Sequence, residues 1–163
     1  MRETKKAILE LEDGTVFEGK SFGFEKACSG EVVFNTAMTG YPESLTDPSY
    51  EGQVLVTTFP LIGNYGVPPK EEQDGVVRYF ESSRIHCEAI VCQDYSWEYS
   101  HWLAEESLSD WLKREQVVGV YGIDTRALTK LLREKGSMLG RIFIEGAEKP
   151  EFYDPNKENL VAK

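Results

Sequence analysis

The stretch VVGVYGIDTRALTKLLREKGSMLGRIFI, residues 117–144, decides the fold class of this chain because its hydrophobic period changes twice. Residues 117–121 are a short apolar run, which is typical of a buried strand. Residues 125–135 then follow the period of an amphipathic helix, and residues 138–144 return to a strand-like pattern. The stretch therefore predicts a strand, a helix and a second strand in close succession.

The helix within this stretch has clear start and stop signals. Asp124 is a favourable N-cap, Gly136 is a favourable terminator, and Arg133 and Lys135 suit the negative end of the helix dipole. The expected buried stripe consists of Ala127, Leu128, Leu131 and Leu132.

Outward from this stretch, the first half of the chain is rich in strand signals. Alternating residues on both sides of Asp13-Gly14 predict a hairpin, and this dipeptide is the one favoured by tight primed turns. Further strands are expected at residues 30–36, 53–59 and 86–92, and a helix at residues 107–115. Strands that come first and then alternate with helices indicate a mixed α/β domain.

The composition limits the classes of partner. The 163 residues include 40% hydrophobic side chains, enough for one domain with a real core, and the net charge is −10. This charge repels phosphate backbones, so nucleic acid is not expected as a partner. No run approaches the roughly 20 apolar residues that span a bilayer, and the start lacks a signal-peptide core, so the sequence predicts a cytoplasmic protein with no membrane partner.

The sequence contains no pattern of a self-contained active site or metal site. Cys28, Cys87 and Cys92 are expected to be buried free thiols, with Cys87 and Cys92 on opposite faces of one strand. A zinc site would have to recruit His86 or His101 at spacings that do not suit it. A hydrolase built on Cys28 and His86 is a remote alternative. We therefore predict no catalytic residue and no metal in this chain.

The segment NTAMTGYPESLTDPSYEGQ, residues 35–53, is rich in hydroxyls and tight turns yet contains no His, Cys or Lys. Asp47-Pro48-Ser49-Tyr50 has the form of a turn in which Pro48 presets φ and Ser49 presents a hydroxyl. Such a segment suits the binding of a polar ligand better than attack on it. A capped turn that merely joins two core elements is the alternative interpretation.

Several blocks in the sequence resemble one known family. They lie at residues 31–41, 45–50, 60–66, 123–129 and 132–136. In content, order and spacing they are similar to the small subunit of glutamine-dependent carbamoyl phosphate synthetase, in particular to its amino-terminal domain. The resemblance implies a mixed, barrel-like β/β/α "swivelling" domain with flanking helices.

The resemblance also implies a division into domains. Residues 1–145 would be the amino-terminal domain, and the polar residues 146–163 would be a linker toward a class I glutamine amidotransferase domain that this chain does not contain. That other domain would carry the Cys, His and Glu that hydrolyse glutamine. The chain alone is thus expected to release no ammonia from glutamine.

Specific residues acquire roles from the resemblance. Ser49 is similar to a serine that contacts the glutamine substrate. A second segment would lie near the domain junction and the ammonia path, and it comprises Asn35, Thr36, Ala37, Met38, Thr39, Gly40 and Tyr41.

The expected partners are the large subunit, the amidotransferase domain and glutamine. The large subunit would combine ammonia with bicarbonate and ATP to make carbamoyl phosphate for pyrimidine and arginine biosynthesis. No cofactor is expected in this domain, since ATP and Mg²⁺ would be used by the large subunit. A stand-alone interaction module that reuses the same fold is the alternative function.

Overall fold

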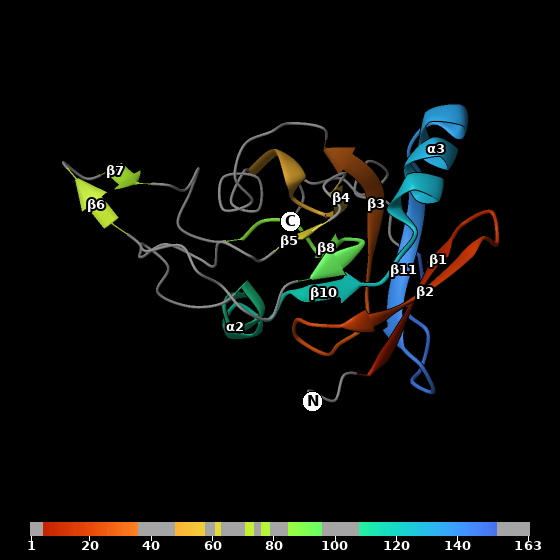
Figure 1. Cartoon of the computed structure of the whole chain (residues 1–163), viewed down its shortest axis with the longest axis horizontal. Helices are drawn as coiled ribbons and strands as arrows, with labels where there is room; N and C mark the ends of the chain where they lie inside the picture. Colours follow the sequence, from red (N-terminus) through yellow and green to blue (C-terminus); the bar gives the residue numbers. More distant parts are fainter. Residues whose placement is uncertain are drawn as a thin grey trace.

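The computed structural model describes residues 5–35, 48–57, 61–62, 71–73, 76–78, 85–95 and 108–152. Seven strands form a closed barrel in the order β1-β11-β3-β4-β8-β10-β2 (Figure 1). These are β1 (Lys6–Leu11), β2 (Val16–Ser21), β3 (Cys28–Asn35), β4 (Gln53–Thr57), β8 (Ala89–Val91), β10 (Val118–Tyr121) and β11 (Met138–Ile144). The mixed, barrel-like α/β fold predicted from the sequence is confirmed.

The remaining elements are short. Two small sheets pair β5 (Leu61–Ile62) with β9 (Asp94–Tyr95), and β6 (Glu71–Gln73) with β7 (Val76–Arg78). The helical elements are η1 (Pro48–Tyr50), α2 (Leu108–Arg114) and α3 (Thr125–Lys135). None of the helices in the described ranges is long and apolar enough to cross a membrane.

Four neighbouring strands of the barrel, β3, β4, β8 and β10, run parallel, and the other three pair antiparallel with their neighbours. Three of these strands, β4, β8 and β10, are buried on both faces. In β4, Val54 and Val56 point into the barrel, whereas Leu55 joins a second apolar cluster outside it. Burial on both faces explains why these strands are continuous apolar runs in the sequence rather than alternating ones.

The two helices close different sides of the barrel. Leu128 and Leu132 of α3 belong to the same cluster as the interior strand residues, so α3 closes the interior. Leu108, Trp111 and Leu112 of α2 cover the outer cluster. Gly119 makes this close approach possible, because a Cβ there would lie 2.8 Å from Leu112 Cδ1.

The start and end of α3 agree with the prediction, and so do the bounds of β11. The Asp124 carboxylate accepts a hydrogen bond from Ala127 N at 3.0 Å. The predicted stripe was wrong at Ala127, which is exposed, and the buried face includes Thr125 and Thr129 instead. Thr125 lies three residues before Leu128, and Thr129 lies three residues before Leu132, so both threonines share the buried face. Ala127 lies on the opposite side of the helix.

The hairpin joins β1 and β2 as expected, but its turn differs from the prediction. Leu11 N donates to Thr15 O at 2.8 Å, Gly14 N donates to Leu11 O at 2.9 Å, and Gly14 has φ of 92°. Asp13 does not have a positive φ. Because primed turns need a positive φ at the first central residue, the loop is a longer one with glycine in the left-handed position.

The strand expected at residues 86–92 is limited to β8, residues 89–91. Cys87 and Cys92 both pack into the outer cluster, so the prediction that they lie on opposite faces was wrong. The reason is that Cys87 lies in a bend before β8, where the two-residue alternation of a strand does not apply.

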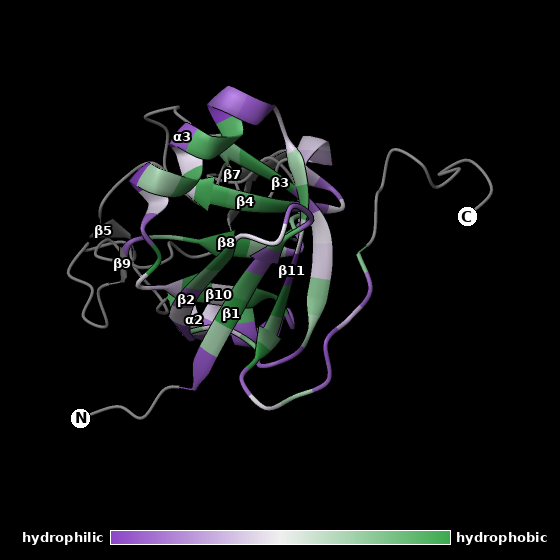
Figure 2. Cartoon of the chain, turned by 90° about the vertical axis from the view of Figure 1, so that its right-hand side faces the viewer, coloured by the Kyte–Doolittle hydropathy of each residue, from purple (hydrophilic) through white to green (hydrophobic). Residues whose placement is uncertain are grey.

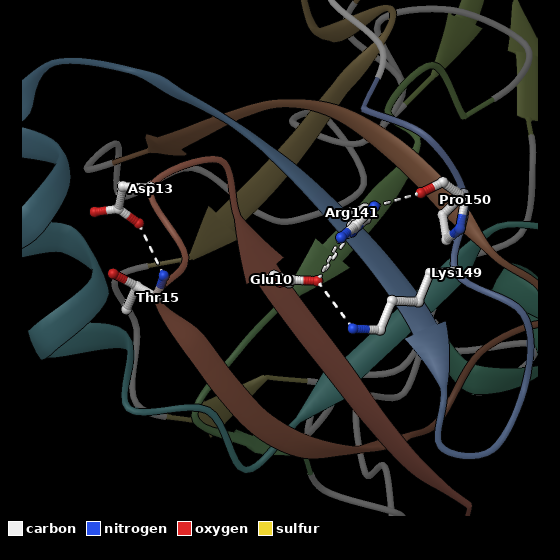
Figure 3. Close-up of polar contacts among 6 residues, drawn as sticks. All are labelled: Glu10, Asp13, Thr15, Arg141, Lys149 and Pro150. Carbon is white, nitrogen blue, oxygen red and sulfur yellow. Dashed lines mark hydrogen bonds and ion pairs between the residues drawn. The ribbon is translucent and has the colours of Figure 1, made fainter.

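The segment after β11 packs back onto the outside of the barrel (Figures 2 and 3). Arg141 donates to Glu10 Oε1 on β1 and to the carbonyl oxygen of Pro150, and its guanidinium lies 4.4 Å from the ring centroid of Phe152. Lys149 Nζ lies 3.7 Å from Glu10 Oε1. Residues through Phe152 are therefore held against β1 and β11, while the boundary near residue 145 and the linker role of residues 146–163 remain predictions.

The contacts of Arg141 make the free energy of unfolding of this chain depend on pH in the acidic range. Its hydrogen bonds hold the pKa of Glu10 below the usual range. A depressed carboxyl pKa contributes stability above about pH 4.3, and this contribution is lost as pH falls through the folded-state pKa. We expect Arg141→Met to flatten the decline of the urea unfolding midpoint between about pH 5 and pH 3, relative to the wild type.

The matched control is Lys5→Met, which removes the exposed ion pair with Glu25. Exposed pairs contribute little, so this control should keep the acid dependence of the wild type. An unchanged acid dependence in Arg141→Met would contradict the role assigned to the Arg141 contacts.

Candidate functional site

The predicted turn around Ser49 is one turn of 3₁₀ helix, η1, directly before β4. Glu51 N donates to Pro48 O at 3.1 Å, which closes the turn. Ser49 is exposed, whereas the neighbouring Tyr50 is half-buried and packs against the outer cluster. The turn thus presents the serine to the surroundings and anchors itself through the aromatic ring.

A close backbone contact fixes the position of this turn. Gly52 follows it with φ of 77°, and a Cβ on Gly30 of β3 would lie only 2.4 Å from Gly52 O. Only glycine at position 30 lets the two strands approach in this way. The sequence analysis did not identify this pair, because nothing in the linear pattern places residue 30 beside residue 52.

Polar side chains brace the same region. Gln53 Nε2 donates to Glu31 Oε1 at 2.8 Å, and Ser137 Oγ donates to Glu31 Oε2 at 2.9 Å. His86 Nδ1 lies 2.7 Å from Glu51 Oε2. These contacts join β3, β4, the residue before β11 and the segment before β8, so the Ser49 turn is mounted on a rigid framework.

Asn35 and Ser49 lie at opposite ends of the β3–β4 pair. In the parallel register Asn35 is beside Thr57, whereas Glu31 is beside Gln53, which follows the turn. Four residues of strand separate these positions by about 13 Å. The structure therefore places the start of the predicted domain-junction segment away from Ser49. The rest of that segment, residues 36–41, lies outside the described residues, so its role stays a prediction.

The three thiols are free and buried. Burial raises the pKa of Cys28 to about 12, and burial together with the nearby Glu88 charge raises that of Cys87 as well. A nucleophilic cysteine needs a lowered pKa, because the thiolate is the reactive form. Cys28 and Cys87 are therefore structural residues, and the alternative of a hydrolase built on Cys28 and His86 loses its chemical basis.

The described residues include no group of three or more His, Cys, Asp and Glu that is arranged to hold a metal ion. His86 contacts a single carboxylate, and His101 lies outside the described residues. The arrangement around η1 is thus suited to presenting a hydroxyl, not to generating a nucleophile.

Comparison with known families shows the family to which this barrel domain belongs. The family described as carbamoyl-phosphate synthase small chain, CPSase domain, matches residues 9–142, from β1 to β11. The chain belongs to this family. The match includes the Gly30–Gly52 contact, the η1 turn with Ser49, and both helices.

The curated relatives of this CPSase domain include proteins of two kinds. The carbamoyl phosphate synthase arginine-specific small chain of Eremothecium gossypii is 53% identical over 164 residues, covering 99% of this chain and 41% of the relative. Multifunctional protein ura1 of Schizosaccharomyces pombe is 56% identical over 153 residues, covering 92% of this chain. Multifunctional protein URA2 of Saccharomyces cerevisiae is 54% identical over 175 residues, covering 95%.

The chain spans a minor part of each of these relatives, 41% of the arginine-specific small chain and 7–8% of the two multifunctional proteins. Among solved structures, an aminopeptidase from Aneurinibacillus sp. strain AM-1 overlays with a TM-score of 0.45 at 16% identity, covering 90% of this chain and 31% of the aminopeptidase. At that level of similarity neither fold nor function transfers.

The Gly30–Gly52 contact generates a prediction for this CPSase domain. Gly30→Ala places a methyl group against backbone, which cannot give way as a side chain does, so we expect a loss of about 1–3 kcal/mol. We also expect faster amide hydrogen exchange at Glu51, whose N–H closes the turn. Urea unfolding and exchange monitored by NMR measure the two effects.

Gly146→Ala is the matched control, because Gly146 has φ of 87° and no atom within 4 Å of its added Cβ. It should lose stability from backbone strain yet leave exchange at Glu51 unchanged. Equal exchange at Glu51 in both variants would show that the Gly30 contact does not position the turn.

The buried thiols generate a second prediction. At pH 8 we expect iodoacetamide to label Cys28 in the native protein roughly 10³-fold more slowly than in urea, from the difference between a pKa of about 12 and one of about 8.5. Stability should also fall as pH rises above about 9, because the unfolded chain then releases thiol protons that the folded chain keeps.

An exposed reference thiol, Ser137→Cys, should label at the rate of the unfolded chain. Native labelling of Cys28 as fast as that of the reference thiol would instead revive a thiol–imidazole pair with His86.

Proposed function

We propose that this CPSase domain helps to complete the glutamine site of carbamoyl phosphate synthase and docks its large subunit. Glutamine would be hydrolysed by a class I amidotransferase domain elsewhere in the same protein. The ammonia would be used with bicarbonate and ATP to make carbamoyl phosphate. The observation that carries the proposal is the exposed Ser49 on a turn that the barrel holds firmly.

The geometry of η1 supports a role in binding. A hydroxyl that contacts a substrate binds best when its position is fixed before the ligand arrives. If the turn were disordered, ordering it on binding would cost conformational entropy and weaken the affinity. Here Tyr50 packs against the outer cluster directly after Ser49, and the Gly52–Gly30 contact holds the backbone three residues after it. The alternative of a capped turn also accounts for the anchoring, and a substitution of Ser49 separates the two through its effect on glutamine use.

The chemistry of the described side chains supports a role in binding for this domain and a catalytic role for another domain. Cys28 and Cys87 have raised pKa values, and His86 contacts Glu51. A chain with these groups is suited to shaping a pocket whose reactive thiolate belongs to another domain. Glutamate formation from glutamine by residues 1–163 alone would contradict this division.

The names of the relatives support the pathway assignment. They comprise arginine-specific small chains and multifunctional proteins, which is consistent with roles in arginine and pyrimidine biosynthesis. A cytoplasmic location belongs to the same proposal, because three free, buried thiols suit a reducing compartment.

The experiment is Ser49→Ala in the complete protein, assayed with its large subunit. Loss of one hydrogen bond of about 1 kcal/mol should raise the KM for glutamine about fivefold. The rate of carbamoyl phosphate synthesis from added ammonia should stay unchanged, because that reaction bypasses the glutamine site. Steady-state kinetics with each nitrogen source measures both quantities.

Ser137→Ala is the matched control, since Ser137 is also exposed and its hydroxyl bonds to Glu31 in the framework below the turn. It should raise the KM for glutamine less than Ser49→Ala does, because the Ser137 hydroxyl supports the turn only indirectly, through Glu31. Unchanged glutamine kinetics in Ser49→Ala would remove this residue from the site, and equal effects in both variants would assign the loss to the framework instead.

A further inference from the structure

Helix α3 presents a row of cations on its exposed side. Arg126, Lys130 and Arg133 are all exposed and follow one another at intervals of four and three residues. On an α-helix these intervals place side chains on one face, over a length of about 10 Å. We call this row the α3 cation stripe, and Figure 2 shows that hydrophilic and hydrophobic residues alternate along α3.

The cations of the stripe lack acidic partners within the described part of the chain. Arg126 and Lys130 form no ion pair there, and Arg133 lies instead over the ring of Phe34, at 5.2 Å from its centroid. Lys135 on the same helix does have a partner, because its Nζ lies 3.2 Å from Asp13 Oδ2. Like charges at such intervals repel one another, so the stripe weakens the isolated helix.

The stripe is held in a fixed position. Leu128 and Leu132 are buried in the barrel interior, and Asp124 caps the first turn. The Phe34 ring fixes the guanidinium of Arg133 next to the end of β3. Ala127 is exposed beside the cations, and its small side chain lets a partner approach the helix closely. The backbone that carries the stripe and the guanidinium of Arg133 are therefore preorganised, which favours recognition because less conformational entropy remains to be lost.

The charge of the whole chain narrows the choice of partner. With a net charge of −10, three cations beside a single acidic residue of the same helix, Glu134, are a local reversal of sign. An acidic protein surface complements such a row. A second copy of this chain is a poorer match because two chains of −10 repel each other, and a phosphate ligand would require donors that converge on one point rather than a row of exposed side chains.

We propose that the α3 cation stripe docks an acidic surface of the large subunit of carbamoyl phosphate synthase. This inference rests on the proposed docking function and specifies the surface that performs it. Because rim charges act mainly on association, the stripe should raise the association rate and its dependence on salt more than it slows dissociation.

The test measures binding of the large subunit to the complete protein by surface plasmon resonance at several salt concentrations. The double variant Arg126→Glu with Lys130→Glu should bind about tenfold more weakly at low salt, mainly through a slower association rate. The difference should shrink at high salt, where exposed charges are screened. Arg126→Ala with Lys130→Ala should show a smaller loss in the same direction, which keeps the test valid if the reversed charges disturb folding.

The matched control is Lys20→Glu with Lys113→Glu, which changes the net charge by the same amount at exposed cations on β2 and α2. It should bind like the wild type. An equal loss in the control would show an effect of total charge and overturn the proposal, as would wild-type affinity in both α3 variants. Failure of the wild type itself to bind would overturn the docking function instead.

Two further measurements test the other possible partners of the stripe, a second copy of this chain and an anionic ligand. Sedimentation that shows a wild-type dimer dissociated by the α3 changes would assign the stripe to self-association and overturn the proposal. Competition by inorganic phosphate at constant ionic strength would assign it to an anionic ligand, with the same consequence.

Discussion

The barrel depends on the pairing of β11 with both β1 and β3. This pairing joins segments that are far apart in the chain, as in the contact of Glu10 with Arg141 across 131 positions. The register places Leu9 and Ile142 inside the barrel and Glu10 and Arg141 outside it. A shift of one residue would exchange the two sets, so burial of the apolar set specifies the register.

Closure of the barrel accounts for the rest of the architecture. Once β11 is in place, the interior is a single apolar cluster, and α3 contributes Leu128 and Leu132 to it. The outer face of the parallel strands forms the second cluster, which α2 and Tyr50 cover. The Ser49 turn is attached to this second cluster, so its position depends on packing of the outside of the barrel and not on its own sequence alone.

The candidate site and the α3 cation stripe occupy different parts of the same scaffold. Ser49 comes immediately before the amino end of β4, whereas α3 begins just after the carboxyl end of β10 and carries Arg133 next to the end of β3. Parallel strands separate their two ends by the length of the strand. The Ser49 turn therefore lies at one end of β4 and the α3 cation stripe beyond the other, so the two proposed roles use separate surfaces of the barrel.

The sequence by itself determined the elements whose signals are local: α3 with its Asp124 cap, β11, the hairpin of β1 and β2, the turn at Ser49, and the family to which the blocks of residues belong. The blocks also suggested the role of Ser49, which stays a proposal. Only the tertiary structure decided the exposure of Ala127, the common cluster of Cys87 and Cys92, and the contact of Gly30 with Gly52. Caps and periodicity act over a few neighbouring residues, whereas these last features depend on which distant strand lies alongside, and that is settled when the barrel closes and its apolar faces are buried.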